Sequence, residues 1–364
     1  MTKVLISGAG IAGPTLAWWL TRFGMEATLV ENAPHLRTGG YVLDFWGAGF
    51  DVAERMGLLP EILGKGYMVR EVRVVNRHGK RVSAFPVKAF ARIARGRYTS
   101  LPRGDLAATI FRGVEGKIET IFGDSIQQIE QDGSAVHVSF EREPARTFDL
   151  VIGADGLHSN VRRLVFGAEE QFEKYLGYKV AAFDAGGYRP KDELVYVMYT
   201  EVGQQVARFT MRGDRTMFLF IFADADPAFP HGIEEQKSVL RSRFGDSGWE
   251  CPEILNALDG ATELYFDRVS QIRIDPANGW AARGRVALIG DAASCPSFLA
   301  GQGSALAMVA AYILAVELRR ANGDHTLAFA RYGDLFQPFV AQKQRAALRL
   351  AGSFAPPSKW ALFL

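Results

Sequence analysis

The chain has 364 residues, more than one hydrophobic core usually organises, so two domains are expected. A net charge of +2 argues against a nucleic-acid-binding surface, and the two cysteines, Cys251 and Cys295, are too few for a disulfide framework, which favours a reducing compartment. The apolar run 304–318 is too short to span a bilayer and the N-terminus has no secretory pattern, so a cytoplasmic protein without a membrane segment is expected.

The chain opens with a strand, a glycine-rich turn, a helix and a second strand that ends in Glu31. The turn matches G-x-G-x-x-G, in which the glycines allow a tight turn, close approach of a pyrophosphate and close packing of helix on strand. The carboxylate of Glu31 is placed to accept hydrogen bonds from ribose hydroxyls and would repel a 2′-phosphate, so FAD or NAD fits better than NADP. A glycine turn needed only for packing is the alternative. The predicted dinucleotide-binding residues are Gly8, Gly10, Ile11, Ala12, Gly13 and Glu31.

The next segments alternate between hairpins and helices. Residues 70–87 read as a hairpin around His78-Gly79, and LPRGDL begins a helix at about residue 103. Residues 126–141 read as a second hairpin, and the stretch 148–167 as a buried strand followed by a turn and a helix start.

From about 178 to 268 the chain is rich in Phe, Tyr and Met on β-like segments, which predicts an antiparallel sheet with a helix beside it. Aromatic side chains on this sheet suit a flat hydrophobic substrate, and Arg208 could pair with a phenolate or carboxylate. Because strand side chains alternate between faces, half of these residues would instead fill the core behind the sheet. The substrate-contacting residues predicted here are Tyr199, Arg208 and Phe220, with Phe209, Phe218 and Phe222 as further candidates.

A second glycine-rich loop, GDAASCPSFLAGQG, runs from Gly290 to Gly303 between a buried strand and an apolar helix. A nucleotide needs one phosphate loop, so two unlike loops almost 280 residues apart indicate one long ligand held at both ends. The cofactor domain is therefore expected to be discontinuous.

Three ordered motifs resemble those of the class A flavoprotein monooxygenases of the p-hydroxybenzoate hydroxylase type. They are GAGIAG, then GADGLHSNVRR through Asp155, Gly156, Ser159 and Arg162, and then the second loop through Gly290, Asp291, Pro296, Gly301 and Gly303. The resemblance covers about residues 1–320 and is strongest to the tetracycline-inactivating monooxygenases and aromatic polyketide hydroxylases. Many relatives have His where this chain has Ser294, a change that does not threaten flavin binding.

The resemblance implies further FAD-binding residues. Asp291 would accept hydrogen bonds from the ribityl chain, and the helix after Gly303 would direct its N-terminal N–H groups at the flavin, although a plain helix cap is the alternative for Asp291. Asp44 would contact FAD, Arg37 would help to recruit NADPH and Arg103 would reach the flavin side, while surface or helix-entry charges are the alternatives. The set implied by the resemblance is Arg37, Asp44, Arg103, Asp155, Asp291, Pro296, Gly301, Gln302 and Gly303.

The family resemblance also implies the reaction. NADPH or NADH would reduce FAD, and a C4a-hydroperoxyflavin formed with O₂ would hydroxylate an aromatic, polycyclic phenolic substrate such as a tetracycline or polyketide, in antibiotic resistance or in biosynthesis. Neither a catalytic side chain nor a metal site is expected, because the six histidines are scattered. The alternatives are another flavin-dependent reductase or oxidase, and a non-catalytic flavoprotein that binds aromatic polyketides; the tryptophan motif of flavin-dependent halogenases is missing.

Together these observations predict an α/β fold, with a Rossmann-like FAD-binding domain, an inserted antiparallel substrate domain and a C-terminal helix. The FAD-binding domain would comprise residues 1–69, 98–175 and 269–320, the sheet domain 70–97 and 176–268, and a helical segment 321–364. The protein is expected to be a monomer or weak dimer with small-molecule partners only. The apolar ending SKWALFL would either continue into a longer natural chain or pack on the body.

Overall fold

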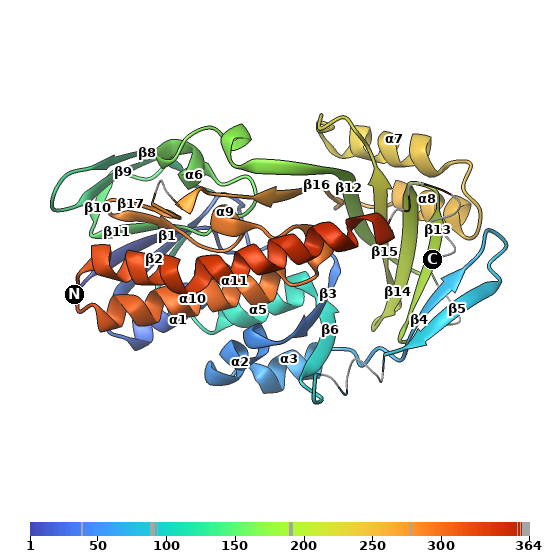
Figure 1. Ribbon diagram of the computed structural model, residues 1–364, viewed down its shortest axis with the longest axis horizontal. Coiled ribbons are helices and arrows are strands. Elements are labelled where there is room, and N and C mark those ends of the chain that lie inside the picture. The colour runs from blue at the N-terminus through green and yellow to red at the C-terminus, as the bar shows by residue number, and fades with distance from the viewer. Residues whose placement is uncertain are drawn as a thin grey trace.

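The computed structural model describes residues 1–37, 39–87, 92, 94–188, 192–276, 279–354, 356 and 358. Two lobes lie side by side, one with a largely parallel sheet and one with a large, mainly antiparallel sheet (Figure 1). The long helix α11 (His325–Phe354) begins on the first lobe and runs toward the second.

The first lobe is organised by a six-stranded sheet in the order β17-β18-β11-β1-β2-β7. All neighbours are parallel except β17 and β18, and the central strands are continuous apolar runs because both faces of the sheet are covered. Register pairs Ser7 with Gly153 and Gly153 with Leu288, so the carboxyl ends of three strands meet at one edge. The strands are β1 (Lys3–Ser7), β2 (Glu26–Glu31), β7 (Glu119–Phe122), β11 (Leu150–Gly153), β17 (Ala282–Arg283) and β18 (Val286–Leu288).

Helices surround this sheet, and α1 and α10 pack against each other. A Cβ on Gly49 of α2 would lie 2.5 Å from the Cα of Ala305 in α10, so glycine is needed where these two helices approach. The helices of this lobe are α1 (Ala12–Arg22), α2 (Ala48–Arg55), α3 (Leu59–Lys65), α5 (Arg103–Arg112), α6 (Asn160–Val165), α9 (Asp291–Ser294) and α10 (Gly303–Arg320), with short 3₁₀ turns η1 (Glu169–Gln171) and η3 (Phe298–Ala300).

Two small sheets complete the lobe. One pairs β3 with β6, and the other is a meander of three strands. Their strands are β3 (Val42–Trp46), β6 (Tyr98–Pro102), β8 (Ile126–Gln131), β9 (Val136–Phe140) and β10 (Arg146–Phe148). The predicted hairpin at 126–141 is therefore present as β8 and β9.

The second lobe is a seven-stranded sheet in the order β16-β12-β15-β14-β13-β4-β5, antiparallel except where β13 runs parallel to β4. Helices α7 (Ile233–Phe244) and α8 (Cys251–Asp259) cover one face, and the other face is turned toward the first lobe (Figure 1). The strands are β4 (Glu71–Val75), β5 (Arg81–Pro86), β12 (Glu173–Gly186), β13 (Val195–Glu201), β14 (Gln204–Met211), β15 (Arg215–Ala223) and β16 (Tyr265–Ile272).

The predicted fold class is confirmed, including the inserted sheet and the C-terminal helix. Two strands cross the predicted domain boundaries, because β12 already begins at Glu173 and β16 continues to Ile272. Most of the segment SKWALFL lies outside the described residues, so the prediction that it packs on the body stays a prediction. Within the described ranges, no helix combines the length and the apolar character needed to cross a membrane.

Candidate functional site

The first glycine loop lies at the carboxyl end of β1 and is held against β11. A Cβ on Gly8, whose φ is +107°, would come within 2.5 Å of the carbonyl oxygen of Ala154, and a Cβ on Gly13 would overlap the carbonyl oxygen of Gly8. Ile11 and Ala12 start helix α1, and Ile11 caps it without a side-chain hydrogen bond, so the free N–H groups of its first turn are available to an anion. The loop therefore has the tight geometry that a pyrophosphate site requires.

Glu31 and Arg103 flank this loop. The two carboxylate oxygens of Glu31 accept the N–H groups of Ala9 (2.8 Å) and Ala33 (2.9 Å), so Glu31 fixes the loop at the end of β2. A carboxylate oxygen has a second lone pair, so both oxygens can still accept ribose hydroxyls. Among the described residues, a Cβ added to Gly10 would have Nη2 of Arg103, 3.8 Å away, as its neighbour. The space beside Gly10 is thus open and faces a cation, which fits the phosphates of FAD.

The second loop follows β18 and places Asp291, the first residue of α9, beside the N-terminus of α10. Gly290 and Gly301 both have a φ of +61°, the left-handed region that favours glycine, and Ser297 adopts a φ of +97°, where a side chain is strained. Gln302 caps α10, whose first residue is Gly303; a Cβ there would lie 3.8 Å from Oδ1 of Asp291. The carbonyl oxygen of Pro296 accepts a hydrogen bond from the Gln271 side chain, which ties the loop to β16.

Asp291, Arg103 and Tyr41 form an electrostatic group between the two loops. Burial raises the pKa of Asp291, and the Arg103 cation opposes that rise. Burial also raises the pKa of Tyr41 to about 12, so its phenol stays protonated at neutral pH. The backbone N–H of Arg103 donates to the carbonyl of Tyr41 at 2.9 Å, so β3 and α5 hold both side chains in place. The structure thus brings the predicted Asp291 and Arg103 together although 188 positions separate them in the chain.

Asp155 acts on the protein itself. Its carboxylate accepts the Ser159 hydroxyl and the Val161 N–H at the start of α6, and burial raises its pKa. The same turn forms the surface against which Gly8 packs. Asp155 therefore supports the first loop from behind, and its predicted direct contact with FAD stays a prediction.

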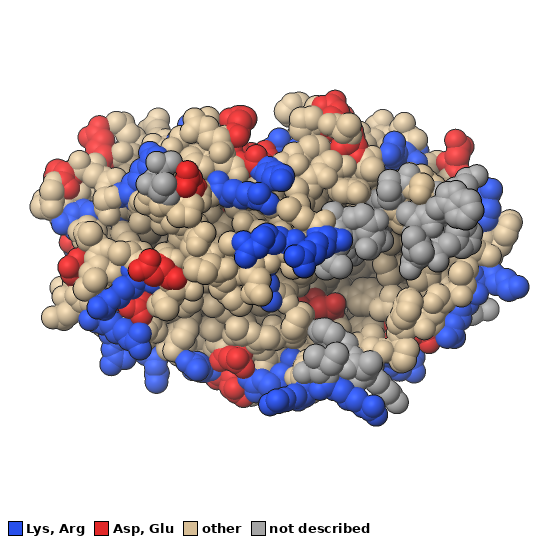
Figure 2. Space-filling model, in the orientation of Figure 1, with Lys and Arg blue, Asp and Glu red and all other residues tan. Residues whose placement is uncertain are grey.

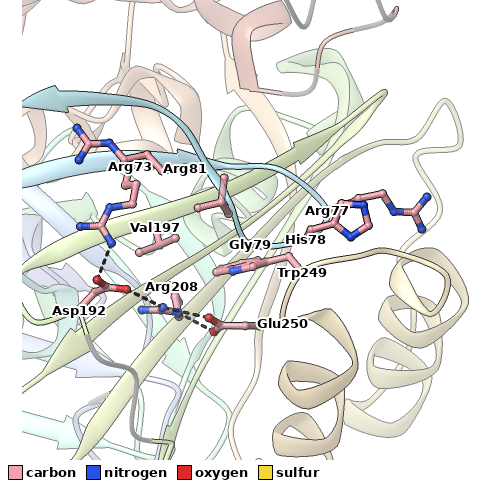
Figure 3. A pocket seen from close by; sticks show the side chains of 11 residues that line it. Arg73, Arg77, His78, Gly79, Arg81, Asp192, Val197, Arg208, Trp249 and Glu250 are labelled. Carbon is pink, nitrogen blue, oxygen red and sulfur yellow. Dashed lines mark hydrogen bonds and ion pairs between the residues drawn. The ribbon is translucent and has the colours of Figure 1, made fainter.

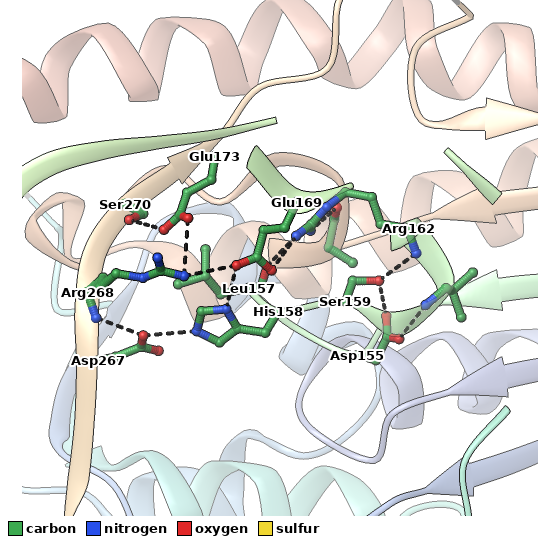
Figure 4. A network of polar contacts seen from close by, with 12 residues as sticks. Asp155, Leu157, His158, Ser159, Arg162, Glu169, Glu173, Asp267, Arg268 and Ser270 are labelled. Atoms are coloured by element: carbon green, nitrogen blue, oxygen red, sulfur yellow. Dashed lines mark hydrogen bonds and ion pairs between the residues drawn. The ribbon is translucent and has the colours of Figure 1, made fainter. Parts of the chain in front are cut away.

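A polar network joins this turn to the second lobe (Figure 4). The His158 ring bridges Glu169 at 2.9 Å and Asp267 of β16 at 3.0 Å, and these two carboxylates raise the pKa of His158 to about 10. Arg268 pairs with Glu169 at 3.0 Å, and the fully buried Arg162 pairs with the same carboxylate at 3.1 Å. The network fixes the sheet relative to the cofactor loops.

Asp44 and Arg37 lie at the surface of the first lobe. Asp44 is exposed, and its Oδ1 accepts the hydroxyls of Tyr98 (2.9 Å) and Ser100 (2.6 Å) from the neighbouring strand. Arg37 is an exposed side chain. The contact of Asp44 with FAD and the role of Arg37 with NADPH stay predictions.

The face of the large sheet that is turned toward the loops carries residues that the sequence reasoning missed. Tyr196, Leu219 and Tyr265 are half-buried on this face, and the ring of Tyr41 lies 5.3 Å from Tyr265 and 4.8 Å from Phe298 of the second loop. Figure 2 shows a hollow between the two lobes, with an acidic group inside it. An apolar wall therefore faces the loops across the lobe boundary.

The three predicted substrate residues lie on the opposite face, so that prediction is corrected. Tyr199 and Phe220 belong to the core between the sheet and helices α7 and α8, and Arg208 pairs there with Glu250 at 2.7 Å and Asp192 at 3.1 Å. The side chains alternate between the two faces of the sheet as expected, but Tyr199, Arg208 and Phe220 lie on the helix-covered face and not on the face turned toward the loops. Of the further candidates, Phe218 and Phe222 share the helix-covered face, and only Phe209 lies on the face turned toward the loops.

Comparisons with known proteins identify the family of this chain. The model of the FAD binding domain family matches residues 1–241. A flavin-dependent monooxygenase from Legionella longbeachae is 34% identical over 362 residues, covering 97% of this chain and 89% of that protein. An uncharacterized protein of Mycobacterium tuberculosis, Rv1260, is 39% identical over 353 residues, covering 94% of this chain and 92% of its own length.

Solved structures extend the likeness to the whole fold. The crystal structure of tetracycline destructase Tet(51) has a TM-score of 0.87 at 32% identity, covering 100% of this chain and 93% of that chain. HpxO of Klebsiella pneumoniae, solved with FAD and uric acid, has a TM-score of 0.81 at 21% identity, covering 100% of this chain and 91% of that chain, and shows the shared fold. With both loops in place and relatives of known class along its full length, the chain belongs to the FAD binding domain family and is an FAD-binding class A flavoprotein monooxygenase.

Proposed function

We propose that this enzyme uses NAD(P)H and O₂ to hydroxylate an aromatic, polycyclic phenolic substrate. The observation that carries the proposal is the apolar wall of Tyr196, Leu219 and Tyr265 on the sheet face turned toward the first lobe, where Leu219 and Tyr265 pack with Phe298 and Leu299 of the second loop. A broad apolar surface with a few tyrosine hydroxyls suits a flat, fused-ring ligand.

The cofactor loops are suited to the two halves of FAD. Glu31, the N–H groups at the start of α1 and Arg103 would hold the ribose and pyrophosphate. Asp291 would hold the ribityl hydroxyls, and the N-terminus of α10 would stabilise negative charge on the ring system. FAD, when bound and reduced by NAD(P)H, supplies the activation of O₂.

The aromatic residues beside the second loop would contribute by positioning the substrate rather than by acid–base chemistry. Tyr41, with its pKa raised to about 12, remains a hydrogen-bond donor at neutral pH and can orient a phenolate oxygen. The packed rings of Tyr41, Tyr265 and Phe298 exclude water from the space beside the second loop. An electron-rich ring held there would meet the cofactor in a dry, oriented site.

Tetracycline-like compounds are the first substrates to test. Tet(51) is a tetracycline destructase, and its likeness to this chain covers both lobes. A role in resistance to such antibiotics, inside the cytoplasm, is part of the proposal.

The experiment is NADPH and NADH oxidation by the FAD-loaded protein across a panel of tetracyclines and other polycyclic phenols, with mass spectrometry of the products. The proposal expects a substrate-stimulated rate and a product heavier by one oxygen atom. Stimulated oxidation that yields only hydrogen peroxide, or substrate reduced without gain of oxygen, would contradict it and favour a binding protein or a reductase.

A further inference from the structure

A second cavity lies on the helix-covered face of the large sheet, away from the cofactor loops. Its volume is about 600 Å³, and it is lined by β4, the turn into β5, strands β13 and β14, and the loop before α8 (Figure 3). Val197 of β13 and Arg208 of β14 line it, whereas Tyr196 and Phe209 of the same two strands lie on the opposite face, with the wall near the second loop. The thickness of the sheet therefore separates the two sites.

Arg208 forms the floor of this cavity and is only 4% exposed. Its Nε donates to Glu250 at 2.7 Å, and its Nη2 donates to Glu250 and Asp192, both at 3.1 Å. Its Nη1 is buried and has no hydrogen-bond partner among the described residues. A buried guanidinium N–H without an acceptor is costly, so this group calls for a ligand acceptor.

Trp249 forms one side of the cavity in a strained conformation. Its φ is +59°, which is rare for a large side chain, and its N–H donates to the carbonyl of Arg77 at 2.6 Å. This backbone geometry holds the indole against Gly79 and 5.7 Å from the Arg208 guanidinium. Strain of this kind is found most often where a side chain must be held for binding.

The rim of the cavity carries positive charge. Four arginines and two carboxylates line it, and Arg77 and Arg81 extend from the β4–β5 hairpin at its mouth. Arg81 is 59% exposed and lies 3.8 Å from Glu71, so much of its charge remains available to a ligand. Val75 and Val197 add apolar surface between the charges.

We propose that this cavity binds a small planar aromatic carboxylate at a site separate from the flavin site. The carboxylate is attracted by Arg77, Arg81 and the Arg208 guanidinium, whose Nη1 lacks an acceptor among the described residues, while its ring packs on Trp249. A carboxylate fits better than a cation because arginines outnumber carboxylates, and a ring fits better than an aliphatic chain because of the indole.

The test uses 2-naphthoate and isothermal titration with the FAD-loaded protein. Arg81→Gln and Trp249→Ala are expected to weaken binding of 2-naphthoate roughly tenfold, and uncharged 2-naphthalenemethanol to bind about tenfold more weakly than the carboxylate. Arg208→Gln would remove an ion-pair partner from the half-buried Asp192 and Glu250, which disturbs the protein itself, and is therefore not the deciding variant. Arg215→Gln is the matched control, because Arg215 is 55% exposed and pairs with Asp184 on the same sheet outside the cavity.

The visible absorption of FAD separates this cavity from the flavin site. We expect 2-naphthoate to bind wild-type protein and Arg215→Gln equally without changing the flavin spectrum. Equal affinity in all four proteins, a changed flavin spectrum that tracks binding, or no measurable binding would each overturn the proposal.

Discussion

The two faces of the seven-stranded sheet share the same strands but differ in chemistry. The face turned toward the cofactor loops presents half-buried Tyr196, Leu219 and Tyr265. The other face is packed with phenylalanine against α7 and α8 and carries the Arg208 ion pairs toward β4. The first face leaves room for a ligand next to FAD, whereas most of the second is sealed core.

The difference shows that residue type alone does not identify a substrate surface. Arg208 and Phe209 are neighbours in β14, yet the arginine lies on the helix-covered face and the phenylalanine lies near the loops between Tyr67 and Tyr196. Phenylalanine is the most frequent aromatic residue of the sequence. On the sheet it is concentrated on the sealed face, because the helices pack closely there. Tyr196 and Tyr265 occupy the open face, where one end of the ring can remain polar.

The largest loss of activity is expected when the first glycine loop can no longer bind FAD beside the open face. In Gly13→Ala the added Cβ would overlap the carbonyl oxygen of Gly8, so the first loop cannot keep its shape. We expect this variant to purify without FAD and to show no substrate-stimulated NAD(P)H oxidation. The absorbance of flavin released from the purified protein measures the FAD content. Gly64→Ala in α3, where an added Cβ meets open space, is the control and should retain full FAD.

The next effect concerns the second loop. Asp291→Ala removes the carboxylate beside the α10 N-terminus, and loss of hydrogen bonds to a charged group is worth about 1.5–3 kcal/mol, or roughly tenfold to hundredfold in FAD affinity. Flavin fluorescence during dialysis measures the loss of FAD. Asp291→Asn keeps a hydrogen-bond acceptor, so its FAD affinity should lie between those of Asp291→Ala and the wild type. A yellow, stoichiometric Asp291→Ala protein would contradict our account of this loop.

A pair of variants tests the two faces directly. Leu219→Ala trims the open wall and should raise KM for the hydroxylated substrate about tenfold, with FAD binding unchanged. Val206→Ala, on the sealed face and 1% exposed, should instead lower the free energy of unfolding by about 2 kcal/mol and leave KM unchanged. Steady-state kinetics and urea unfolding measure both; a raised KM in Val206→Ala alone would reverse the assignment of faces.

The smallest effect concerns the junction that fixes the sheet against the loops. The folded pKa of His158, about 10, lies above its ordinary 6.5, because Glu169 and Asp267 stabilise the cation. The resulting stability is therefore complete below about pH 6.5 and is lost as the pH rises toward 10. His158 is 45% exposed, so solvent screening limits the contribution to about 1 kcal/mol.

His158→Gln should remove that part of the pH dependence. Urea unfolding of the variant and wild type should differ most near pH 6 and converge near pH 10. His231→Gln, an exposed histidine outside the network, is the control. A constant difference at every pH would contradict the ion-pair account.

The sequence predicted the cofactor lobe well because its signals are local. Gly8, Gly13 and Glu31 lie within one βαβ unit, where a backbone turn dictates residue type. The second loop was recognised from its own glycines. The meeting of Asp291 with Arg103 is instead a tertiary contact, because Asp291 follows β18 of the parallel sheet and Arg103 follows β6 of the separate two-stranded sheet.

The substrate side could not be assigned in the same way. The alternation of side chains along a strand showed that Tyr199, Arg208 and Phe220 would share a face with only half of their neighbours. Which face of the sheet becomes buried core depends on where α7 and α8 pack, and that packing is a tertiary contact. Two signals were present: Arg208 is followed by Phe209, and GWE before α8 brings an acid that can pair with the arginine. Tyr41 and Tyr265 had no local motif, since they meet only when β16 reaches the cofactor lobe.

The most direct test of the central claim is the reaction run under oxygen-18 gas with the FAD-loaded enzyme, NADPH and the best substrate of the panel. Our account predicts a product that carries one oxygen-18 atom, formed in step with NADPH consumed. A product with oxygen from water, or with no added oxygen, would contradict hydroxylation by this flavoprotein.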